Sequence, residues 1–134
     1  MSIGKLIVIY PSGDHRIVDA EPDLLHQLQQ LVGGWLEVIR NRHGNLAVQL
    51  GDNLSNHLIA VVDEEGLLQK NFQYNGITSF LLQYTGVLVG DAVLLREGRN
   101  KDGEPDLYPL TEDDASRLSL LLQLMWSREV WEDV

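Results

Sequence analysis

The sequence predicts an α+β fold in which a single mixed, mainly antiparallel sheet is packed by two to three helices. Short apolar, β-branched runs recur along the chain, and stretches with helical spacing separate some of them. A hairpin comes first and the elements then follow in an irregular order, which disfavours a doubly wound parallel sheet. Since 134 residues can bury one hydrophobic core, we expect residues 1–134 to form a single domain.

The first part of the chain predicts a hairpin followed by a helix. Residues 5–10 and 15–19 are β-rich runs separated by a Pro-Ser-Gly-Asp turn. Pro22 is tolerated in the first turn of a helix, and the carboxylates beside it favour the positive end of the helix dipole. Apolar residues then recur at helical spacing as far as Gly33: Leu24, Leu28, Leu31 and Val32.

The stretch LQQLVGGWLEVI, residues 28–39, changes its hydrophobic period at two glycines. We expect Gly33 to end the helix in a left-handed conformation, which costs glycine less than other residues. Gly34 then lets the chain turn sharply into the sheet, and Trp35 covers the junction. From Trp35 onward the apolar period is two, which indicates a strand with one buried face.

The rest of the chain predicts further strands and two more helices. The expected strands are 46–50, 57–62, 87–95 and 107–110, and the expected helices are 76–83 and the segment after Thr111, its N-cap. Ile77, Phe80, Leu81 and Tyr84 share one face of the first of these helices. Gly90 marks a bulge or a close backbone approach inside its strand. Residues 96–105 resemble an irregular loop.

The last helix carries more apolar residues than one buried side requires. Leu118, Leu121, Leu122 and Met125 form an inner stripe, and other apolar residues lie around much of the remaining circumference: Leu120, Leu124, Trp126, Val130 and Trp131. We expect a homo-oligomer formed through this C-terminal helix, with a twofold dimer as the simplest case. A groove within the same domain is the alternative that would also cover the helix.

Composition limits the classes of partner. The formal net charge is −10, whereas affinity for a phosphate backbone needs clustered Lys and Arg, so we expect no direct nucleic-acid binding. The acids are spread along the chain, which indicates solubility rather than a DNA-like surface. The sequence has no cysteine, which excludes disulfides and thiolate chemistry. Without a secretory signal or an apolar run near the roughly 20 residues of a membrane span, we expect a cytoplasmic protein and no membrane partner.

No motif indicates catalysis, a metal site or a cofactor, so we expect a protein that is not an enzyme. The four histidines lack metal-ligand spacing, and the glycines form no phosphate-binding motif. Residues 12–15 place a serine, an aspartate and a histidine side by side, but catalytic triads are assembled from distant segments and a turn explains these residues. The acids at 63–65 would suit a hydrolase, and they would equally suit an ordinary charged turn.

Two basic loops are the candidate binding sites of this acidic chain. The first contains Arg40, Arg42 and His43, and the second contains Arg96, Arg99 and Lys101. If the loops meet, they could hold phosphates. An aromatic ring could then stack on a base, and the candidates are Tyr10, Phe72, Tyr74 and Tyr84. Scattered solubilising charges and core aromatics are the alternative interpretation.

Several motifs resemble, in order, a bacterial and phage family known as domain of unknown function 3846. They are LQQLVGGWLEVI, AVVDEEGLL, the YNG of residues 74–76, VLVGDAVLL and PLTEDD, and the resemblance runs from about Ile7 to Leu122. The chain departs from the family pattern at residues 69–73 and in its tryptophan-containing tail. The resemblance implies a phage or mobile-element accessory protein without assigned chemistry, and it directs attention to Asn75.

Three functional hypotheses follow from these observations. The leading one is a non-catalytic accessory protein that sequesters a small nucleotide-derived ligand, such as a host immune signal, in pockets formed by Tyr74, Asn75 and the two basic loops. The second is an acidic inhibitor, or DNA mimic, that binds a host enzyme. The third is a carboxylate-dependent hydrolase that uses the acids at 63–65.

Overall fold

The computed structural model describes residues 3–40, 57–68, 73–82, 84 and 86–125. The strands are β1 (Lys5–Ile9), β2 (His15–Asp19), β3 (Leu36–Arg40), β4 (Leu58–Asp63), β5 (Ala92–Arg99) and β6 (Pro105–Tyr108). The helices are α1 (Leu24–Val32), α4 (Gly76–Leu82), α5 (Glu112–Met125) and the 3₁₀ turn η1 (Gly66–Leu68). The expected strand at 46–50 lies outside the described residues.

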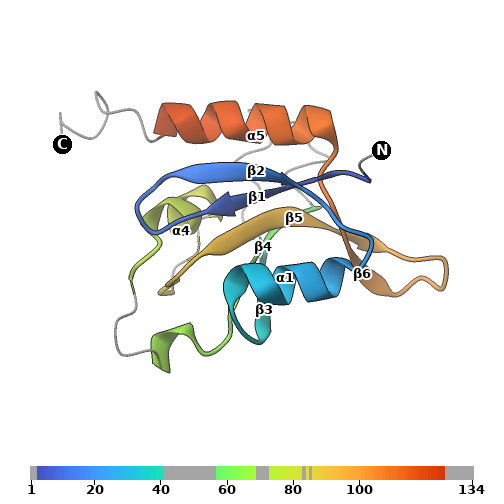
Figure 1. Ribbon diagram of the computed structural model, residues 1–134, viewed down its shortest axis with the longest axis horizontal. Coiled ribbons are helices and arrows are strands. Elements are labelled where there is room, and N and C mark those ends of the chain that lie inside the picture. Colours follow the sequence, from blue (N-terminus) through green and yellow to red (C-terminus); the bar gives the residue numbers. More distant parts are fainter. Residues whose placement is uncertain (1–2, 41–56, 69–72, 83, 85, 126–134) are drawn as a thin grey trace.

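One sheet forms the centre of the molecule. Its order is β2-β1-β5-β4-β3, with β6 paired to the far part of β5, and the pairings between these strands are antiparallel. Helix α5 lies along one side of the sheet and α1 lies on the opposite side (Figure 1). The predicted α+β architecture is therefore confirmed.

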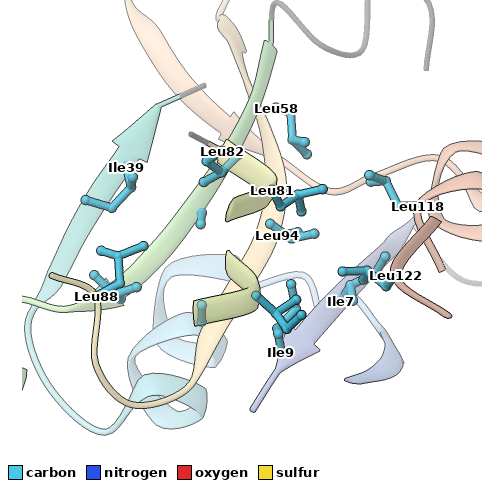
Figure 2. Close-up of a cluster of buried hydrophobic side chains, with 14 of the residues drawn as sticks. Ile7, Ile9, Ile39, Leu58, Leu81, Leu82, Leu88, Leu94, Leu118 and Leu122 are labelled. Atoms are coloured by element: carbon cyan, nitrogen blue, oxygen red, sulfur yellow. The ribbon is translucent and has the colours of Figure 1, made fainter. Parts of the chain in front are cut away.

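Side chains alternate between the two faces of the sheet, so each face has its own core. On the α1 face, Leu28 packs against Leu6, Val8, Ile59, Val61, Val93 and Leu95. On the other face, residues of the sheet meet residues of α4 and α5 (Figure 2), and these include Ile7, Ile9, Leu94, Leu81, Leu118 and Leu122. The central strands are buried on both faces, which explains their nearly continuous apolar sequence.

The junction between α1 and β3 has the predicted backbone. Gly33 adopts φ +84° at the C-cap, and its N–H donates to the Gln29 carbonyl at 2.9 Å. The prediction of one buried face for β3 is wrong, because Ile39 packs in one core while Leu36 and Val38 pack in the other. Trp35 remains 68% exposed.

Three other predictions needed correction. The strand expected over 87–95 begins only at Ala92, because Gly90 turns the chain with φ +76°. Residues 96–105 are not an irregular loop, since β5 and β6 form a hairpin with register Arg96↔Tyr108 to Arg99↔Pro105. Within α4, Phe80 is 68% exposed although Ile77 and Leu81 are buried, so the four apolar residues do not share one buried face.

Candidate functional site

The hairpin of β5 and β6 carries the candidate site because β5 extends past Leu58, the first residue of β4. Strand pairing between them ends at Leu58↔Arg96, so residues 97–99 of β5 continue beside His57. An open pocket of about 420 Å³ lies there, and its lining residues are His57, Arg96, Glu97, Gly98, Arg99 and Tyr108. We call it the arginine pocket.

Backbone carbonyls hold both lining arginines. The Arg96 Nε donates to the Pro109 carbonyl at 2.9 Å, and the Arg99 Nη1 donates to the Gly103 carbonyl at 2.6 Å. Neither guanidinium has a carboxylate within 4.0 Å in the part of the chain that the structure describes. Each therefore keeps N–H donors near the pocket that are not paired with a carboxylate.

Tyr108 stands across from Arg96 and forms one wall. Its ring lies over Gly98, where an added Cβ would be 3.1 Å from two ring carbons, so the position favours glycine. The Tyr108 hydroxyl donates to the Arg99 carbonyl at 3.2 Å. These contacts tie the aromatic wall to the strand that carries both arginines.

Arg40 reaches the same site from the end of β3. Its Nε and Nη2 donate to the two oxygens of Glu97 at 2.8 and 2.7 Å, which is a bidentate ion pair across the sheet. The hydrogen bond from Arg40 is the main cause that lowers the pKa of Glu97, and the same bond raises the pKa of Arg40. Glu97 is thus held as a carboxylate, and it neutralises Arg40.

The structure brings together part of the predicted site. Arg96 and Arg99 line the pocket, and Arg40 is joined to it through its ion pair with Glu97. Lys101 lies in the exposed hairpin turn and does not line the pocket. Arg42 and His43 lie outside the described residues. The sequence interpretation missed His57, Glu97 and Tyr108, because treating 96–105 as a loop hid the strand register that places them together.

Tyr74 and Asn75 lie elsewhere, near the other end of β5. Tyr74 is exposed and forms an isolated β-bridge with Val89. Asn75 is fully buried, and its Nδ2 donates to the carbonyls of Ile9 and Gly90 at 3.0 and 2.8 Å. Its Oδ1 accepts from the Thr78 N–H at 3.2 Å. Asn75 is therefore a structural residue that closes the interior, and it does not face the arginine pocket.

The other candidate groups serve turns and packing. Asp63 Oδ1 accepts from the Glu65 N–H at 2.9 Å, as in an ordinary turn. His15 does not join Ser12, because its Nε2 lies 2.7 Å from Ser119 Oγ on α5. Within the described ranges, no three His, Cys, Asp or Glu residues are grouped so as to hold a metal ion. Those same residues also contain no helix that is long and apolar enough to cross a membrane.

Comparison with known proteins identifies a family but no characterised relative. No curated protein and no solved structure matches the chain. A family model described as a domain of unknown function (DUF3846) matches residues 4–122. This match covers most of the 134 residues, including the sheet and nearly all of α5. The chain therefore belongs to the DUF3846 family.

Proposed function

We propose that this protein is a non-catalytic binding protein that sequesters a small nucleotide-type ligand through its phosphates. The observation that supports the proposal most is the arginine pocket, in which two guanidinium groups and an imidazole line one cavity of a chain with net charge −10. Its volume of about 420 Å³ is within the range of small-ligand sites.

The chemistry of the lining suits a phosphate-bearing ligand. Guanidinium groups bind phosphate through paired, charge-assisted hydrogen bonds. Arg96 and Arg99 are already held by backbone carbonyls, so binding would cost little additional ordering of these side chains. Tyr108 lines the same pocket and can stack on a base, since stacking requires only a flat ring.

We propose sequestration in preference to turnover because Glu97, the acid that lines the pocket, is paired with Arg40. Glu97 is the carboxylate in the described lining, and both of its oxygens accept hydrogen bonds from Arg40. A general base works best with a pKa near the operating pH, whereas the hydrogen bond from Arg40 lowers the pKa of Glu97 and makes this carboxylate a weaker base. In the proposed accessory role, the protein would lower the free concentration of a nucleotide signal by binding it stoichiometrically.

The test is calorimetric titration with ADP-ribose and with cyclic dinucleotides as probes. We expect at least one probe to bind, and Arg99→Gln to weaken binding by about tenfold or more, as loss of a charge-assisted hydrogen bond implies. Arg117→Gln is the matched control, because Arg117 lies on α5 in an exposed ion pair with Asp113. Equal affinity in the two variants would contradict the assignment of the site.

A second candidate function is an inhibitor that offers an acidic surface to a basic protein. Exposed acids lie on the hairpin turn, on β6 and in the first turn of α5, and they are Asp102, Glu104, Asp106, Glu112 and Asp113. This function predicts a protein partner captured from host lysate whose binding weakens strongly as salt increases. Capture that persists in Arg99→Gln would favour this candidate over the first.

A further inference from the structure

A second pocket lies at the other end of β3, where α1 gives way to the sheet. It measures about 520 Å³, and its lining residues are His26, Gln29, Gln30, Gly33, Gly34 and Trp35. Arg40 ends the same strand that Trp35 precedes, so this pocket and the arginine pocket are separate. We call it the Trp35 pocket.

Trp35 is exposed to an unusual degree for so large an apolar side chain. It is 68% accessible to solvent, although its backbone is fixed by the Glu64 N–H, which donates to the Trp35 carbonyl at 2.8 Å. Tryptophan usually buries most of its surface in a fold. An indole that is exposed on a fixed backbone is available to stack on a ligand.

Two glycines, Gly33 and Gly34, line this pocket next to Trp35. Nothing lies within 4 Å of the point where a Cβ of Gly33 would stand, so the space above it is open. A Cβ on Gly34 would lie 2.8 Å from Asp63 Oδ1, so a side chain there would have to displace the Asp63 carboxylate. A flat ligand can therefore approach the backbone beside the indole.

The remaining lining side chains are polar, and none of them is a carboxylate. The amides of Gln29 and Gln30 each carry donors and acceptors, and the imidazole of His26 can do either. Amide side chains pair in bidentate fashion with the edge of a base, and aromatic side chains stack on its face. The lining thus combines the two kinds of contact by which proteins recognise nucleobases.

The charge around the pocket indicates whether a ligand with or without a phosphate fits. Asp63 is the last residue of β4 and lies directly against Gly34, and Glu64 and Glu65 follow it in the chain. These carboxylates disfavour a phosphate, since like charges repel. From the exposed indole, the amide lining and the adjacent acids, we propose that the Trp35 pocket binds an uncharged nucleobase or nucleoside.

Titration with the common ribonucleosides, and in parallel with their monophosphates, tests this proposal. We expect at least one nucleoside to bind, and its monophosphate to bind more weakly. Trp35→Ala should weaken nucleoside binding by about tenfold or more, as loss of a stacking contact implies, and Trp35→Phe should restore much of it. Leu25→Ala is the matched control, because Leu25 is exposed on α1 and does not line the pocket.

Three results would overturn the proposal. They are the absence of binding by any nucleoside at millimolar concentration, equal affinity in Trp35→Ala, and tighter binding of the monophosphate than of the nucleoside. Arg99→Gln separates this site from the arginine pocket, because we expect that variant to bind nucleosides as the parent protein does. Failure of the proposed phosphate site would therefore leave this result unchanged.

Discussion

Asn75 shows how one buried amide can join three parts of the fold. It contacts the end of β1 through Ile9, the turn at Gly90 and the first turn of α4 through Thr78. A buried polar group is stable only when it is paired, and its partners depend on it equally. The residue is thus important for stability in a position where the sequence suggested ligand binding.

Replacing Asn75 should cost stability and leave the arginine pocket intact. Asn75→Ala would strand two carbonyls and one N–H in the interior, so we expect the free energy of unfolding to fall by about 2–4 kcal/mol. Urea denaturation measures this change, with the exposed substitution Gln123→Ala as control. If Asn75→Ala were as stable as the control but lost ligand affinity, the binding role first assigned to Asn75 would be correct.

His15 gives the protein a specific dependence on pH. Burial is the main cause that lowers the pKa of His15 below its ordinary value near 6.5, against the opposing charge of Asp14. The unfolded chain therefore takes up a proton at higher pH than the folded protein. The contribution of neutral His15 to the free energy of unfolding is fully present above about pH 6.5. It is lost as the pH falls through the lower pKa of His15 in the folded state.

His15→Gln isolates this effect. The amide can still hydrogen-bond to Ser119 on α5 but does not titrate. From about pH 7.5 to about pH 5.5, we expect the free energy of unfolding of the parent protein to decrease more than that of His15→Gln. Thermal unfolding at a series of pH values measures the difference. Parallel pH profiles for the two proteins would show that His15 makes no such contribution.

Among the elements, the pair of Arg40 and Glu97 links β3 to β5 across the intervening β4. The two hydrogen bonds are short and the geometry is bidentate, yet Arg40 is 58% exposed. An exposed ion pair contributes little to stability, typically about 0.2–1 kcal/mol. We expect the pair to affect binding more than stability, because Glu97 occupies the Arg40 guanidinium, which could otherwise bind a phosphate.

Releasing Arg40 should therefore strengthen the anion site. In Glu97→Gln the local positive charge rises, and we expect pyrophosphate affinity to increase by about threefold to tenfold at low salt. Titration calorimetry of the parent, Glu97→Gln and the double variant with Arg40→Gln measures it. The gain should disappear in the double variant, and a gain that survives there would show that Arg40 is not its source.

The elements with clear local signals were predictable from sequence. Gly33 ended α1 as expected, and Thr111 Oγ1 accepts from the Asp114 N–H at 3.1 Å to cap α5. The hairpin of β5 and β6 was not predictable in the same way. Residues 96–104 are charged or polar or are glycines, so they lack the apolar–polar alternation that identifies a strand. The register of the hairpin is fixed by pairing with a distant segment. For that reason the pocket residues His57 and Tyr108 could not be joined to Arg96 from sequence alone.

At the scale of the whole molecule, part of the apolar surface of α5 is exposed among the residues that the structure describes. Leu118 and Leu122 are buried in the core, but Leu120 and Leu124 are 58% and 60% exposed. They share the outer side of the helix with the ion pair of Asp113 and Arg117. This exposed pair is consistent with the expected homo-oligomer, which stays a prediction.

Charging that surface should dissociate the oligomer. The double variant Leu120→Lys, Leu124→Lys would place two charges in the proposed interface, where they would be costly to bury. We expect sedimentation velocity to show an oligomer for the parent protein and a monomer for the double variant. Gln123→Lys, an exposed change on the same helix, is the control. A monomeric parent protein would refute self-association.

We expect the protein to hold a nucleotide-type ligand without changing it. The most direct measurement incubates the protein with ADP-ribose or a cyclic dinucleotide, separates free from bound ligand, and then releases the bound fraction by heat. The proposal predicts that ligand is depleted from solution by the parent protein, much less by Arg99→Gln, and is recovered chemically intact. Recovery of an altered product, or no depletion with any probe, would contradict it.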